Sequence, residues 1–507
     1  MAYDDIIVGA GTCGAILAAR LSEDPGRQVL LLEAGPDYQS LEVTPADLLY
    51  GQVSLVDHDW GFSADAGSGR SIPYPRGKVT GGSSAVNGTI ALRGDPADFD
   101  EWAERGLPDW AWEQVLPFYR LPESDPDGAA IHPDNHGVAG PFPIHRQARA
   151  TWQPFQAAFY DACLAHGFDE CDDFNSPPGA GVGVFPRNKR DGVRMSTALT
   201  YLAMVRARPN LEIRPDTLID KVVVERGRAV GVEIVVNGRR ERIGGGQIIL
   251  SAGAVGSPPI LLRSGIGPAA DLTALGIPVV GDLAVGSVLL DHPSAGLPGL
   301  PAEGVRHDND VVTEIGVRYR SADSPEDNDM QLCLATMFDP EQMRGFMPDP
   351  VAMFMVGAVL MRPRSHGHLA LTSPDPTAPP DLHLNYLDDP LDLARMIEAW
   401  RIGRDLCQRE EMKAVVGPLL IDDATLDDDA RIGAVLRDQV TTTYHPAGTA
   451  PMGLPDDRRA VVDAQGRVHG IDGLRVVDAS IMPTSVRSNT NLTCVMLAER
   501  IAAWIMA

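Results

Sequence analysis

Short apolar segments near the start of the chain flank a turn and a helical pattern. Residues 5–8 and 29–32 are compact runs rich in Ile, Val and Leu, and residues 12–21 between them place apolar side chains at helical spacing. Parallel strands that are covered on both faces are apolar throughout, whereas an amphipathic helix shows a longer period. The pattern therefore predicts a strand, a helix and a second, parallel strand.

Downstream, the polar and apolar positions favour antiparallel strands. Residues 222–224 and 229–236 fit neighbouring strands, and residues 247–250 fit a further buried strand. Between residues 301 and 440, alternating segments precede one long helical pattern around Leu393. The 507 residues exceed the size at which a single core usually stops growing, so we expect two domains.

Composition narrows the classes of function. The formal charge is 43 − 69 = −26, and a strongly acidic chain repels nucleic acid and anionic lipid. No apolar run approaches the ~20 residues of a membrane helix, and the six cysteines are scattered without a Cys-x-x-Cys pair. We expect reduced thiols in a cytoplasmic protein with no nucleic-acid partner and no membrane span.

Gly9, Gly11 and Gly14 follow the first predicted strand with dinucleotide-binding spacing. The first glycine permits a tight turn, the second lets a pyrophosphate approach the backbone, and the third lets the helix pack on the sheet. Glu33 stands 22 residues after Gly11, where its carboxylate can accept hydrogen bonds from ribose hydroxyls. The Glu-Ala-Gly sequence at Glu33 resembles FAD-binding proteins more than NAD-binding ones.

Two further glycine-rich segments carry a resemblance to a known family. Residues 77–100 (GKVTGGSSAVNGTIALRGDPADFD) follow the first signature of the glucose–methanol–choline oxidoreductases, except that Thr80 replaces the usual aliphatic residue. Residues 253–267 match the second signature, and residues 473–483 resemble a segment that contacts FAD in that family. From Tyr3 to the last helix, the chain thus resembles this family of flavin enzymes.

The resemblance implies an α/β protein with a Rossmann-like FAD-binding domain and a smaller substrate domain built on an antiparallel sheet. We expect the FAD domain to comprise residues 1–155, 191–300 and 441–507, and the substrate domain residues 156–190 and 301–440. Some relatives attach FAD to a histidine at the position that Val86 occupies here, so we expect non-covalent FAD. The implied cofactor-binding residues are Gly9, Gly11, Thr12, Cys13, Gly14, Glu33, Ala34, Lys78, Gly82, Ser83, Ser84, Asn87, Gly88, Thr89, Ile90, Val223, Ala252, Gly253, Asp478, Ala479, Asn491, Leu492 and Thr493.

His445 lies in a His-Pro-x-Gly-Thr context, where the family places its catalytic base. A neutral imidazole can take a proton from an alcohol near neutral pH. Asn491, 46 positions later, matches the family's second catalytic place and can orient the substrate oxygen or cap the last helix. The pair His366 and His368 has no third ligand at suitable spacing, so we expect a loop there and no metal site.

These residues together predict FAD-dependent oxidation of an alcohol to an aldehyde or ketone by hydride transfer to flavin N5. Oxygen or another acceptor would reoxidise the flavin, and the sequence leaves that choice open. The alternatives are a non-redox lyase or a light-driven decarboxylase on the same flavin scaffold, or a flavin-binding protein without activity. The substrate stays unidentified because the resemblance is weakest over residues 105–190 and 301–360.

Overall fold

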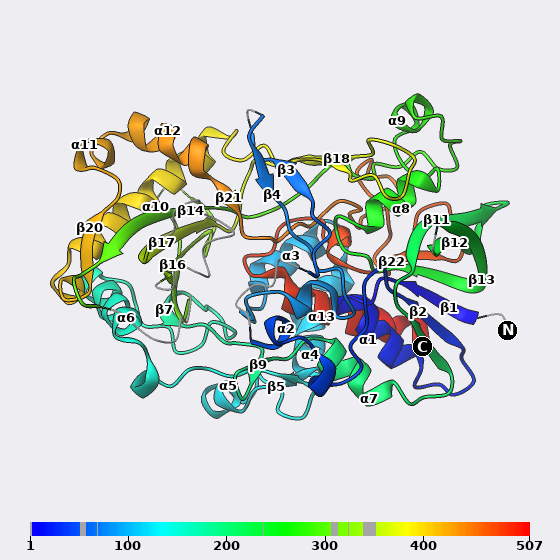
Figure 1. Ribbon diagram of the computed structural model, residues 1–507, viewed down its shortest axis with the longest axis horizontal. Coiled ribbons are helices and arrows are strands. Elements are labelled where there is room, and N and C mark those ends of the chain that lie inside the picture. The colour runs from blue at the N-terminus through cyan, green and yellow to red at the C-terminus, as the bar shows by residue number, and fades with distance from the viewer. Residues whose placement is uncertain are drawn as a thin grey trace.

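The structure is a computed structural model that describes residues 3–50, 57–67, 69–236, 238–305, 313–322, 324–337 and 351–507. Within these residues a seven-stranded sheet at one end of the molecule has the order β10-β2-β1-β13-β12-β11, with β22 beside β13 (Figure 1). Its strands are β1 Tyr3–Val8, β2 Val29–Leu32, β10 Leu211–Arg214, β11 Leu218–Glu225, β12 Arg228–Val236, β13 Arg239–Leu250 and β22 Leu474–Val476. The strands β10, β2, β1, β13 and β22 pair in parallel, so this part of the sheet has a Rossmann-like arrangement.

A second seven-stranded sheet, again counted over the described residues, lies at the other end (Figure 1). Its order is β20-β14-β17-β16-β15-β7, with β21 beside β14, and neighbouring strands pair in antiparallel orientation. The strands are β7 Gly181–Val184, β14 Pro293–Pro301, β15 Ile315–Tyr319, β16 Met330–Met337, β17 Met353–Leu360, β20 Val416–Leu419 and β21 Thr441–Thr442. The predicted fold class, an α/β protein with an added antiparallel sheet, is confirmed.

The division into domains at the predicted boundaries stays a prediction, but two strands cross them. Strand β14 belongs to the second sheet, although most of its residues fall in the expected FAD segment 191–300. Strand β21 pairs with β14, although it opens the expected FAD segment 441–507. Strand β7 lies within the expected segment 156–190, but the later strands of this sheet begin before residue 301 and end after residue 440.

Two helices far apart in sequence lie side by side behind the parallel strands. Helix α1 Thr12–Leu21 packs against α13 Thr490–Met506, and both bury most of their residues. The long α10 Pro390–Gln408 covers the second sheet by packing on β17 and β14. The remaining helices are α2 Ala46–Tyr50, α3 Pro96–Glu104, α4 Trp112–Arg120, α5 Pro126–Ile131, α6 Pro154–His166, α7 Ala203–Val205, α8 Ser257–Arg263, α9 Ala269–Ala274, α11 Asp423–Leu426 and α12 Asp429–Gln439.

Several short strands complete the described chain: β3 Ser63–Asp65, β4 Ser71–Pro73, β5 Glu123–Ser124, β6 Phe142–Pro143, β8 Lys189–Arg190, β9 Val193–Arg194, β18 His368–Ala370 and β19 Asp381–His383. The helix predicted over residues 12–21 and the strand over 29–32 are confirmed at both ends. Strand β13 begins at Arg239, before the predicted 247, because its first half pairs with β12 while carrying exposed polar residues that give no buried-strand signal.

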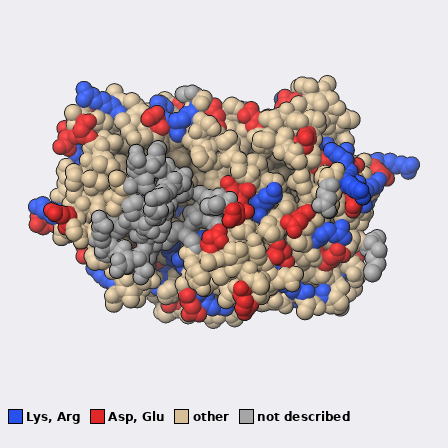
Figure 2. All heavy atoms as spheres, viewed as in Figure 1, with Lys and Arg blue, Asp and Glu red and all other residues tan. Residues whose placement is uncertain are grey.

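The surface has no single charged region on the face shown in Figure 2, where acidic and basic side chains are interspersed. Among the described residues, no helix combines the length and apolar character that crossing a membrane requires. The large apolar residues instead gather in the interior, with Trp102, Trp110 and Trp400 fully buried.

Candidate active site

A cavity of ≈ 750 Å³ lies where segments from the start, middle and end of the chain meet. Its wall includes the turn after β1, the loop after Gly81, the turn after β13, and residues 442–446 and 489–491. The carboxyl ends of parallel strands open onto such a crevice in Rossmann-like folds. The cavity is therefore the candidate active site.

The glycine turns pack against each other so closely that a side chain has no room. A Cβ on Gly82 would lie 2.6 Å from Cα of Gly11, and a Cβ on Gly9 would lie 2.6 Å from the carbonyl oxygen of Ser251. Gly9 and Gly82 also have positive φ values, +95° and +51°, which disfavour other residues. These glycines bring three loops together and leave the backbone bare toward the cavity.

The walls of the cavity fit a dinucleotide. No side chain caps the N-terminus of α1, whose N-cap is Gly11, so its free N–H groups are available to a phosphate. Glu33 accepts hydrogen bonds from Ala10 N and Gly35 N, both at 2.9 Å, and a carboxylate has further lone pairs for ribose hydroxyls. Burial raises the pKa of Glu33 to about 7, despite those backbone bonds, because desolvation disfavours its charge.

Asp478 joins the end of β22 to the turn after β13. One of its carboxylate oxygens accepts from Gly253 N at 2.9 Å and from the Ser257 hydroxyl at 2.6 Å, and the other accepts from Ser480 N at 2.9 Å. These bonds hold two wall segments that are more than 200 residues apart in sequence.

Most of the predicted cofactor residues lie in the cavity wall, and six do not. The lining includes Gly9, Gly11, Thr12, Cys13, Glu33, Ala34, Gly82, Ser83, Asn87, Gly88, Thr89, Ile90, Ala252, Gly253, Asp478, Ala479 and Asn491. Outside it are Gly14, Lys78, Ser84, Val223, Leu492 and Thr493.

The residues outside the wall have other contacts. Ser84 is fully buried and donates to Gly81 O at 2.6 Å, and the hydroxyl of Thr493 bonds that of Tyr119 at 2.8 Å. Val223, a candidate for a backbone contact to the adenine of FAD, lies on β11 outside the wall, whereas Leu218 and Ile219, earlier on the same strand, line the cavity. The contact of Val223 with the cofactor stays a prediction.

His445 lies in the loop after β21 and borders the cavity. Its Nδ1 is 2.9 Å from Thr443 Oγ1 and 3.0 Å from His292 Nδ1, and its Nε2 is 3.0 Å from Asn489 Nδ2. Burial holds the pKa of His445 well below its ordinary value, and the neighbouring His292 and Arg76 lower it further. The imidazole is therefore neutral at pH 7, as a proton acceptor requires.

The expected partner of His445 needs a correction. The structure places Asn489, and not Asn491, against the imidazole. The side-chain oxygen of Asn491 instead accepts from the Thr12 hydroxyl at 2.8 Å, which ties α13 to α1. Asn489 is also the N-cap of α13, a position that the sequence assigned to Asn491.

Asp291 and His292 are functional candidates whose role the sequence did not reveal. Asp291 is buried, and one of its oxygens accepts from His292 N at 2.8 Å and from His445 N at 2.9 Å. Its other oxygen accepts from the hydroxyls of Tyr74 and Tyr386, both at 2.7 Å, and of Thr442 at 2.6 Å. The adjacent Asp-His pair in the sequence was a usable signal, but the distance to His445 appears only in the fold.

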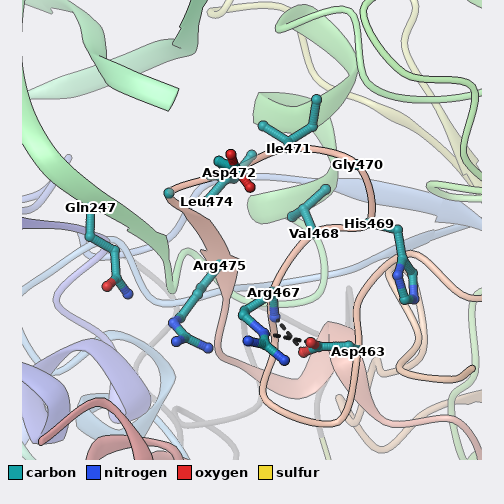
Figure 3. A pocket seen from close by; sticks show the side chains of 11 residues that line it. Gln247, Asp463, Arg467, Val468, His469, Gly470, Ile471, Asp472, Leu474 and Arg475 are labelled. Carbon is teal, nitrogen blue, oxygen red and sulfur yellow. Dashed lines mark hydrogen bonds and ion pairs between the residues drawn. The ribbon is translucent and has the colours of Figure 1, made fainter. Parts of the chain in front are cut away.

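A second hollow of ≈ 340 Å³ lies away from His445, around β22 and the loop before it. Figure 3 shows its polar wall, in which Arg467 donates to Asp463 with Nε at 2.6 Å. Because none of the residues around His445 lines it, this hollow is not part of the candidate active site.

Among the described residues, one group has donor atoms spaced as a metal site requires: Glu123, Asp125 and His136. Arg93 pairs with Glu123 at 2.5 Å and Arg146 with Asp125 at 2.5 Å, so cations already occupy these carboxylates. His366 and His368 belong to no such group, although the ring of His368 stacks on that of His383 with centroids 4.5 Å apart.

Comparison with known proteins agrees with this geometry. Two models of the GMC oxidoreductase family match residues 3–294 and 363–498. A 5-(hydroxymethyl)furfural oxidase from Methylovorus sp. (strain MP688) is 36% identical over 539 residues, which cover 99% of this chain and 98% of that protein. An oxygen-dependent choline dehydrogenase from Chromohalobacter salexigens is also 36% identical, with 99% and 94% coverage.

Solved structures show the same architecture. Pyridoxine 4-oxidase from Mesorbium loti superposes with a TM-score of 0.89 at 29% identity and covers 99% of both chains. A formate oxidase from Aspergillus oryzae, studied for FAD modification, gives 0.90 at 26% identity with 99% and 98% coverage. The protein is thus a member of the GMC (glucose–methanol–choline) oxidoreductase family, an FAD-dependent enzyme that acts on CH–OH donors.

Proposed function

We propose that this protein oxidises a small alcohol to an aldehyde or ketone, with His445 as the general base and Asn489 as its partner. The observation that carries the proposal is the neutral imidazole at the cavity wall, with Nε2 3.0 Å from the Asn489 amide. When bound in the cavity, FAD supplies the acceptor for the two electrons that leave the alcohol carbon as a hydride. The protein supplies the proton acceptor and the orientation of the substrate.

The hydrogen bonds of Thr443 and Asn489 favour one tautomer of His445. The Thr443 hydroxyl donates to His292 O at 3.0 Å, so its oxygen is free to accept from Nδ1–H of His445. Nε2 then carries the lone pair, which receives the Asn489 amide N–H. A substrate hydroxyl placed between the two can donate its proton to Nε2 while its oxygen accepts from the Asn489 amide.

The cavity wall favours an organic alcohol of modest size. Trp60 and Phe62 line the cavity with their rings stacked, 5.7 Å apart and 5° from parallel. The acids in the wall all hold backbone groups: Glu33 and Asp478 as described, and Asp59 through Arg76 N at 2.7 Å. A neutral substrate with an apolar body therefore fits this wall better than a cationic one, and the relatives named for oxidising 5-(hydroxymethyl)furfural and pyridoxine support the same class.

An anaerobic screen of alcohols tests the proposal. The FAD-loaded protein should lose its flavin absorbance in the dark with at least one small alcohol, and an aldehyde or ketone should accumulate in equal amount. Repeating the reaction in air with peroxide detection tells oxygen from another acceptor. Bleaching only under light, or product formation without bleaching, would favour the lyase or photodecarboxylase alternative.

The FAD should be bound without a covalent link. Val86 is 7% exposed, packs with Leu48, Val79 and Ala85, and offers no nucleophilic nitrogen. After acid precipitation of the holoprotein, we expect the yellow colour in the supernatant. Colour that remains in the washed pellet would show a covalent link through another residue.

A further inference from the structure

The residue before His445 has a strained backbone. Tyr444 has φ = +66°, the left-handed region that bulky residues rarely adopt. Such a conformation persists only where surrounding contacts hold it, and it is found most often at functional sites. The conformation of Tyr444 sets the direction in which the next residue, His445, enters the cavity wall.

Three hydrogen bonds hold this peptide from three parts of the fold. The Thr442 hydroxyl accepts from Tyr444 N at 2.6 Å, and Asp291 accepts from His445 N at 2.9 Å. On the other side, Nη1 of Arg76 donates to Tyr444 O at 2.9 Å. Arg76 is 368 residues away in sequence, so this bond exists only in the assembled fold.

The guanidinium of Arg76 is fixed in place but not neutralised. It lies over the ring of Tyr74, 4.5 Å from the centroid, and the Tyr74 hydroxyl bonds to Asp291. Its Nε and Nη2 atoms are buried and have no partner among the described residues. Arg76 therefore brings a positive charge to the cavity wall without a carboxylate hydrogen-bonded to its side chain.

The positive charge of Arg76 acts on the imidazole of His445. The charged or titratable groups around His445 are Arg76, His292, Asp291 and, through Asp291, the phenols of Tyr74 and Tyr386. Burial makes His292 neutral by lowering its pKa to about 4, and burial raises the pKa of both phenols well above their ordinary values. Of this set, His292 and Arg76 disfavour a proton on His445, and Arg76 is the one that carries a permanent charge.

We propose that Arg76 is a positioning residue for His445: it fixes the Tyr444 peptide that carries the histidine and disfavours a proton on its imidazole. The inference rests on the proposed function only in taking His445 as the base. The effect on the imidazole is a property of the protein that can be measured without turnover.

Variants at Arg76 separate charge from geometry. Arg76→Met removes the cation and the bond to Tyr444 O, and Arg76→Lys keeps the cation but not the planar geometry of the guanidinium. Arg105→Met is the control, because it removes one cation from an exposed pair with Glu101 on α3. If Arg76→Met does not retain FAD, Arg76→Gln takes its place.

The main readout is the pH titration of His445 in FAD-loaded protein labelled with ¹⁵N-histidine, with the resonance assigned by its absence in His445→Gln. Removing a nearby cation favours the protonated imidazole, so His445 should titrate at higher pH in Arg76→Met than in the wild type. In Arg76→Lys and Arg105→Met, His445 should titrate at the same pH as in the wild type. The rate of flavin reduction should fall on the order of 10²-fold in Arg76→Met and less in Arg76→Lys, as expected for a misplaced base.

An unchanged His445 titration in Arg76→Met, or an equal shift in Arg105→Met, would overturn the inference. A shifted titration in Arg76→Met combined with normal flavin reduction in His445→Ala would leave the inference standing and refute the base assignment. The two claims thus fail through different measurements.

Discussion

His445 and His136 are both enclosed by protein, yet their surroundings drive them to opposite charge states. His445 is flanked by a neutral histidine, an amide and an arginine, and its pKa lies well below the ordinary value. For His136, burial also opposes the charge, but the acids beside it outweigh burial and raise the pKa to about 10. Its Nε2 bonds to Asp173 at 2.7 Å, and its Nδ1 lies 3.2 Å from Asp125 and 3.3 Å from Glu123. Burial alone therefore does not decide the protonation state; the partners do.

The different protonation states of His136 and His445 suit different roles in the protein. The cluster around His136 holds three carboxylates, two arginines and one imidazolium, which sum to zero charge inside the protein. A protonated His136 thereby serves as the third cation and joins residues 123–125 to Asp173. His445 is instead neutral at the cavity wall, with Nε2 3.0 Å from the Asn489 amide, as the proposed role of proton acceptor requires.

Replacing His136 by Gln should cause the largest loss of stability among these changes. The substitution leaves three buried carboxylates with only two cations, Arg93 and Arg146, and an uncompensated buried charge typically costs about 3–5 kcal/mol. Urea unfolding of the holoprotein measures the free energy, and His132→Gln, at a largely exposed pair with Asp172, should change it by less than about 0.5 kcal/mol. Equal effects of the two variants would contradict the assigned role of His136.

Alanine substitutions of Asn489 and Asn491 should have different effects, one on the orientation of the substrate and the other on the binding of FAD. Asn489→Ala removes the amide beside Nε2 and should slow flavin reduction about tenfold, the scale of one lost hydrogen bond of about 1.4 kcal/mol. Asn491→Ala loses the bond to Thr12 and should weaken FAD retention more than the limiting reduction rate. Stopped-flow reduction at saturating alcohol, with FAD loss measured by dilution, compares the two. A larger rate loss in Asn491→Ala would restore the assignment made from sequence.

Stability should also depend gradually on pH, with opposite signs for two histidines. The pKa of His136 is raised in the folded state, so its contribution is complete below pH ~6.5 and is lost as the pH rises through about 10. The pKa of His292 is lowered to about 4, so the unfolded chain takes its proton first and stability falls as the pH drops from ~6.5 toward 4. Urea midpoints across this range test both slopes, and His136→Gln should abolish the alkaline one. A midpoint that does not fall toward pH 10 in the wild type would contradict the imidazolium assignment.

The sequence predicts the cofactor half of this molecule well because its signals are local. Gly9, Gly11 and Glu33 have meaning through their spacing from one strand, and the structure places all three in the cavity wall. Asn489 and Asn491 show where such reasoning stops. Residues two apart at the start of a helix point roughly 200° from each other, so only the phase of α13 in the fold decides which one meets His445.

Contacts between distant segments could not be predicted from the sequence either, because they too depend on the assembled fold. Asp291 and His292 stand out as a pair, but their bonds to His445 span 154 and 153 residues. Strands β14 and β21 of the second sheet carry Pro, Gly and Thr rather than an apolar run, so no pattern marked them as strands. Tertiary pairing, and not local propensity, makes these segments strands.

Anaerobic stopped-flow reduction of FAD-loaded His445→Ala, with an alcohol shown to reduce the wild type, tests the central claim most directly. The account predicts a rate ~10²–10⁴-fold below the wild type, the usual contribution of a general base, with the same flavin content. In the wild type the rate should stay constant from pH 8 down to ~6.5, because the pKa of His445 lies well below that value. Reduction of His445→Ala at the wild-type rate would contradict the account and require another proton acceptor in the cavity wall.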